Sequence, residues 1–134
     1  MRGYEVMPDR ERGLQQLAVG DIFHAQSTNG ASLVCLVTAV DGATIYARRI
    51  HTQDDVKFDR NTGFEVGKPH TRIDCVASLP SDIHDIFVQM DRRYQAAHAR
   101  IRQGIEVDLK EARYTADEKR AHDFLDQHIE ANLI

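Results

Sequence analysis

Residues 29–50 read NGASLVCLVTAVDGATIYARRI, and this stretch decides the fold class. It holds two dipeptides typical of the tight turns of β-hairpins, Asn-Gly at 29–30 and Asp-Gly at 41–42. Between them runs the apolar segment 32–40, which is rich in β-branched residues and short for a helix. The stretch therefore predicts two neighbouring strands joined by a tight turn, the first of them buried on both faces.

Strand signals continue on both sides of this stretch. Gly63 follows a turn sequence and is expected to adopt a left-handed conformation, which closes a hairpin with a bulge. The expected strands cover residues 22–26, 32–40, 44–50, 56–58, 64–66 and 72–79. Five or six short strands at about ten-residue spacing, with no helix between them, predict an antiparallel meander that closes into a small barrel.

The last third of the chain has helical periodicity. Ser81 is expected to cap a first helix, in which apolar residues recur at spacings of three and four. Thr115 and Glu118 have the spacing of a capping box and predict the start of a second helix. Residues 105–114 are ambiguous between a short helix and a strand.

These signals divide the chain into three regions. Residues 1–18 are expected to form a poorly ordered N-terminal arm, with a short turn at 14–17. Residues 19–79 form the small β-barrel, and residues 80–134 form a helical extension packed on the barrel or on a partner subunit. The fold class is therefore α+β, an antiparallel barrel followed by a pair of helices.

Composition limits the class of protein. The chain has 134 residues, a formal net charge of −4 and a pI near 5.9, which argues against a dedicated polyanion binder. No apolar run is long enough for a transmembrane helix, and the first twenty residues lack the apolar core of a signal peptide. Two isolated cysteines, Cys35 and Cys75, fit buried reduced thiols. We therefore expect a cytoplasmic protein with no membrane partner.

Motifs of catalysis and cofactor binding are missing. No phosphate-binding glycine loop occurs, and Gly30-Ala31-Ser32 lacks the second glycine of a nucleophile elbow. The seven histidines show no metal-ligand spacing and are expected to be isolated and exposed. The sequence thus predicts no cofactor and no metal and leans against an enzyme. A small enzyme whose site is assembled from scattered His and Asp residues stays a second alternative.

One group of basic residues is interleaved with aromatic residues on neighbouring strands and turns. In a small barrel such residues could converge into a groove for phosphates and stacked bases. This groove is the basis of the first alternative, in which the chain is a nucleic-acid-binding regulator. Against it, basic and acidic residues are equal in number over residues 41–80. The basic strand face consists of Arg48, Arg49, His51, Lys57 and Arg60.

The apolar stripes of the two helices suggest a different role, because each stripe needs a surface to cover it. The leading hypothesis is a non-enzymatic interaction module, a small adaptor or accessory protein that binds a protein partner or self-associates as a homodimer. The helix residues expected to mediate association are Phe87, Met90, Tyr94, Phe124 and Ile129.

The strand count and turn spacing of residues 19–79 resemble those of SH3-like small barrels. The resemblance is one of fold class. It assigns no site residues, since such barrels bind ligands that range from peptides to RNA.

Overall fold

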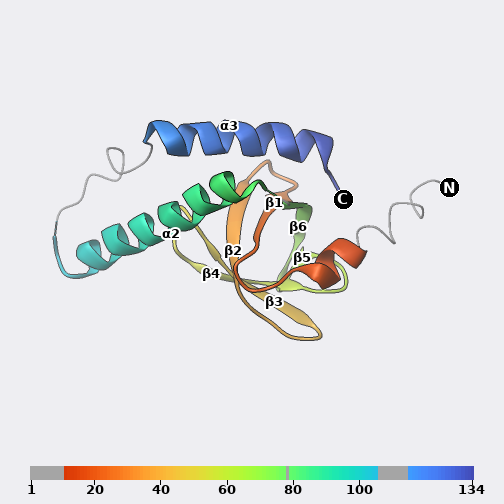
Figure 1. Ribbon diagram of the computed structural model, residues 1–134. Helices are drawn as coiled ribbons and strands as arrows, with labels where there is room; N and C mark the ends of the chain where they lie inside the picture. Colours follow the sequence, from red (N-terminus) through yellow and green to blue (C-terminus); the bar gives the residue numbers. More distant parts are fainter. Residues whose placement is uncertain (1–10, 78, 106–114) are drawn as a thin grey trace.

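The computed structural model describes residues 11–77, 79–105 and 115–134. Six antiparallel strands pair in chain order and the first also pairs with the last, which closes a barrel (Figure 1). This confirms the α+β class and the small antiparallel barrel. The strands are β1 (Ile22–Ser27), β2 (Ser32–Val40), β3 (Thr44–Arg49), β4 (Asp55–Asp59), β5 (Phe64–Glu65) and β6 (Lys68–Ala77).

The barrel interior is filled by side chains that alternate along each strand, so that every second residue points inward. In β2 these are Leu33, Cys35 and Val37, each at most 6% exposed. Phe23 and Phe58 meet edge to face in the centre, with ring centroids 5.2 Å apart. Of the outward residues of β2, Val34 and Leu36 are half-buried against the helices, whereas Ser32 and Thr38 are exposed. The expected burial on both faces therefore holds only for the middle of this strand.

Both cysteines are buried and free, as the sequence predicts. Burial raises the pKa of the Cys35 thiol far above its ordinary value, and that of Cys75 to about 11. A thiol held in its neutral form is a poor nucleophile. The two cysteines therefore act as small apolar side chains of the core.

The described part of the expected N-terminal arm is ordered, which differs from the sequence prediction. Residues 11–16 form a helix, and Leu14 and Leu17 insert into the barrel core with exposures of 0% and 4%. Gly13 lies against β6, where a Cβ atom would approach Val76 to 2.9 Å. The segment therefore closes one end of the barrel. Residues 1–10 of the expected arm lie outside the described residues.

Two helices cover the outside of the barrel on one side (Figure 1). They are α2 (Ser81–Arg102) and α3 (Ala116–Ala131). A second apolar cluster joins their inner faces to outward-facing residues of the barrel such as Ile22 and Ile50. The helices are thus packed on the chain's own barrel. Neither is long and apolar enough to cross a membrane, within the part of the chain that the structure describes.

The two helices begin differently. Thr115 caps α3 as predicted: its hydroxyl accepts the Glu118 N–H, and the Glu118 carboxylate accepts the Thr115 N–H. The expected cap at Ser81 is wrong, because Pro80 occupies the N-cap position and no side chain caps the helix. Most of the ambiguous segment 105–114 lies outside the described residues.

Candidate functional site

Arg48 of the predicted basic strand face is held by α2. Its Nε and Nη2 donate to the two carboxylate oxygens of Asp91, at 3.0 and 2.6 Å, and Gln53 Nε2 donates to Asp91 at 2.9 Å. Burial alone would raise the pKa of Asp91, but these hydrogen bonds outweigh it and hold the pKa below its ordinary value. Arg48 therefore fastens β3 to α2 with a charge-assisted pair.

The remaining members of the basic strand face do not converge on one groove. Arg60 Nη2 donates to the backbone carbonyls of Gln15 and Leu17, at 2.7 and 3.1 Å, and so holds the N-terminal helix. Lys57 lies over the ring of Tyr46. The Arg49 guanidinium lies 3.7 Å from the carboxylate of Asp54. Nucleic-acid binding by this face stays a prediction, and two of its five members already hold other elements of the fold.

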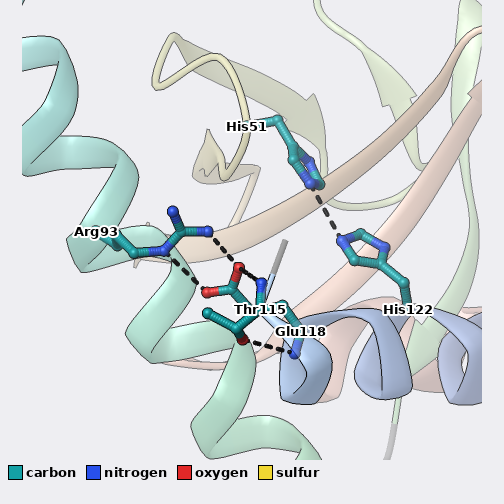
Figure 2. A network of polar contacts seen from close by, with 5 residues as sticks. All are labelled: His51, Arg93, Thr115, Glu118 and His122. Carbon is teal, nitrogen blue, oxygen red and sulfur yellow. Dashed lines mark hydrogen bonds and ion pairs between the residues drawn. The ribbon is translucent and has the colours of Figure 1, made fainter. Parts of the chain in front are cut away.

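His51, the fifth member, meets a histidine of α3. The Nε2 atoms of His51 and His122 lie 3.1 Å apart, so one imidazole donates its proton to the other (Figure 2). The rings of Tyr94 and Phe87 contact this pair edge-on. Burial lowers the pKa of His122 below its ordinary value. The expectation of isolated, exposed histidines is wrong here, because the fold joins residues 71 positions apart.

A second polar link lies beside this pair at the start of α3. Arg93 of α2 forms a two-pronged ion pair with Glu118, whose carboxylate also closes the capping box with Thr115 (Figure 2). The Glu118 side chain is only 7% exposed. This network joins the start of α3 to α2 and so fixes the position of α3, which is a structural role.

The helix residues expected to mediate association lie in the chain's own core. Phe87, Met90 and Tyr94 are at most 3% exposed, and Phe124 and Ile129 are half-buried against the same cluster. All five contribute to the layer between the helices and the barrel. Self-association stays a prediction, and a second copy would have to use other surfaces.

The structure assembles one polar group that sequence reasoning missed. His24 of β1 lies between Asp74 of β6 and Ser32 of β2: its Nδ1 is 2.6 Å from an Asp74 carboxylate oxygen, and its Nε2 hydrogen-bonds the Ser32 hydroxyl. His24 is 5% exposed, whereas Ser32 is exposed. Strand alternation in the sequence could have placed all three side chains on the outer face. It could not have shown that their strands are neighbours in the barrel.

A cleft of about 350 Å³ opens beside this group. Its lining comes from β1, the β5–β6 hairpin and the end of the chain. Apolar parts are supplied by Phe64 and by Leu133, which is 60% exposed. Arg72 and Asp74 both line this cleft. Asp74 is paired with His24, whereas no ion pair joins Arg72 to a described carboxylate. The cleft can therefore take an apolar group together with a negative one.

Metal chemistry finds no support in the described ranges 11–77, 79–105 and 115–134. No group of three or more His, Cys, Asp or Glu side chains there could hold a metal ion. No known protein family, curated protein or solved structure matches the chain.

Proposed function

We propose that this chain is a protein-interaction module whose ligand is a short peptide segment bound in the cleft beside β6. The observation that carries the proposal is the mixed lining of that cleft. Leu133 offers a largely exposed apolar side chain in the same lining as Phe64, and Arg72 offers a guanidinium that forms no ion pair with a described carboxylate. A segment with an acidic residue beside an apolar one would satisfy both features.

This proposal keeps the leading sequence hypothesis and moves its site. The helix faces are covered within the chain, so the proposed binding site moves to the cleft at the end of α3. An SH3-like identity of the barrel and a cytoplasmic location are further proposals. They are supported by the strand count with its tight turns and by the two free cysteines.

Panning a phage-displayed peptide library against the full chain tests the binding role. We expect selected peptides that combine acidic and apolar residues. Their binding should be lost in Arg72→Glu and Leu133→Asp and kept in Val19→Asp, a matched control that introduces charge at another exposed apolar residue. A library that yields no specific binder, or binders insensitive to both cleft variants, would contradict the proposal.

Light scattering on a size-exclusion column tests the alternatives. Because the helices bury their apolar faces on their own barrel, we expect a monomer of 15.2 kDa. A dimer would favour self-association. Co-eluting nucleic acid that is lost at high salt would favour the regulator alternative and the basic strand face.

A further inference from the structure

Three neighbouring strands place Ser32, His24 and Asp74 in one row on the outer face of the barrel. In the pairing of β1 with β6, His24 lies opposite Cys75 and Ala25 lies opposite Ile73. Asp74 therefore has no residue opposite it and forms a bulge. Bulges re-aim side chains and occur often beside active sites. Here the bulge brings the carboxylate against the histidine ring instead of leaving it one position along the strand.

The order of contacts along the row is that of a nucleophile, a base and an orienting group. The Nδ1–H of His24 donates to Asp74 at 2.6 Å, which leaves Nε2 as the acceptor of the Ser32 hydroxyl proton. The group that would react is the most exposed of the three. The base is 5% exposed and the Asp74 side chain 14%, whereas the serine is open to solvent.

The backbone of Ser32 supplies one donor for a developing oxyanion. Ser27 N donates to the Ala31 carbonyl and Val37 N to the Asp21 carbonyl. The alternation of an antiparallel ladder then makes Gln26 and Ser32 a pair without mutual hydrogen bonds, so the Ser32 N–H points away from β1. On that side the pairing of β2 with β3 begins only at Cys35. The Ser32 N–H is therefore available beside its own hydroxyl.

We propose that Ser32 is the nucleophile of an acyl-transfer site, with His24 as general base and Asp74 as its positioning residue, that acts on small activated esters. Ser32 Oγ attacks the ester carbonyl while its proton passes to His24 Nε2. The bond to the leaving alcohol then breaks, and the alcohol takes that proton. Water attacks the acyl-serine in the same way, gives its proton through His24 to Ser32 Oγ, and releases the acid.

The substrate class follows from the surroundings. A single backbone donor stabilises an oxyanion less than a pair of donors does, so good leaving groups are needed. The same cleft is lined at one point by Gln26, the partner of Ser32 across the ladder, and its apolar part at Phe64 and Leu133 has room for a short acyl or aryl group. This inference goes beyond the proposed peptide binding and does not depend on it.

A fluorophosphonate probe and p-nitrophenyl acetate test the site on the full chain. We expect tandem mass spectrometry to find both modifications on Ser32, with loss of fluoride in one case and of p-nitrophenolate in the other. Ser32→Ala should lose the labelling, and Ser81→Ala should keep it, since Ser81 is an exposed serine that makes no capping hydrogen bond.

The role of the carboxylate needs a readout that a purely structural contact would not change. Asp74→Asn should slow acetylation of Ser32 on the order of a hundredfold or more while the chain stays folded, and Asp74→Glu should restore part of the rate. Absence of labelling at Ser32, labelling spread equally over other residues, or a rate unchanged in Asp74→Asn would each overturn the proposal. The three contacts would then serve only to satisfy a buried histidine.

Discussion

The interior of the barrel and the layer between the barrel and its helices are held together by different means. The interior cluster consists of apolar side chains inside a closed ladder of strands. The outer layer also has an apolar cluster, but two buried carboxylates of the helices lie in it as well: Asp91 and Glu118. A closed ladder fixes its strands by backbone hydrogen bonds. Helices packed on the outside of a sheet make no backbone hydrogen bonds to its strands, so directional side-chain pairs must set their positions.

The largest effect should come from the interior. Phe58→Ala removes a fully buried ring that packs on Phe23, and we expect a loss of about 3–5 kcal/mol of unfolding free energy. Urea unfolding followed by circular dichroism and by tyrosine fluorescence measures it. Both probes should shift together, because the barrel unfolds as one unit. A loss below about 1 kcal/mol, the size expected of a surface change, would contradict the central role of this ring.

In the outer layer, Asp91→Ala should have the next largest effect. It leaves Arg48 and Gln53 without their shared acceptor, and we expect a loss of roughly 2–3 kcal/mol, since Arg48 keeps some contact with water. The double variant Arg48→Met with Asp91→Leu should recover part of this loss, because it removes both charges. Equal loss in the single and double variants would contradict this account.

The same carboxylate gives the Arg48–Asp91 pair a pH dependence of known sign. Because the folded pKa of Asp91 is held below its ordinary value of 3.8, the stability it adds is present above that value. This stability is lost as the pH falls through the folded pKa. Acid unfolding of Asp91→Ala should therefore be less steep than that of the unchanged chain.

A smaller effect is expected at the helix starts, which offer a matched pair of substitutions. Thr115→Ala removes the capping box of α3 and should cost about 1 kcal/mol, whereas Ser81→Ala at the start of α2 should cost close to nothing. Thermal unfolding of the two variants side by side measures the difference. Equal melting temperatures would show that tertiary contacts, and not the cap, hold the start of α3.

The smallest effect is a pH dependence at the histidine pair. Burial depresses the folded pKa of His122 below 6.5, so its contribution is present above that pH and is lost as the pH falls toward the folded pKa. Acidification should weaken the docking of α3, although nearby Asp126, Glu118 and Asp123 oppose the shift. Melting temperatures measured down to about pH 5.5 should fall less in His122→Gln than in the control His70→Gln, whose histidine is exposed.

The comparison of the two layers also explains what the sequence could predict. Strand alternation, turn dipeptides and the capping box at Thr115 are local patterns, and the structure confirms them. The polar pairs on the outside of the barrel join residues separated by 43, 50 and 71 positions: Arg48 with Asp91, His24 with Asp74, and His51 with His122. No local pattern carries such a pairing. The helix at 11–16 was missed because only Leu14 and Leu17 mark it in a polar stretch.

Closure of the barrel has a consequence for synthesis of the chain. The last pairing partner of β1 is β6, and the contact between His24 and Asp74 spans 50 residues. A ribosome releases β1 first, so this strand has an unpaired edge until β6 has left the exit tunnel. During that interval the nascent chain exposes the same apolar residues that later fill the interior. A translational pause that holds β6 inside the tunnel should therefore increase aggregation, and a pause after β6 has emerged should not.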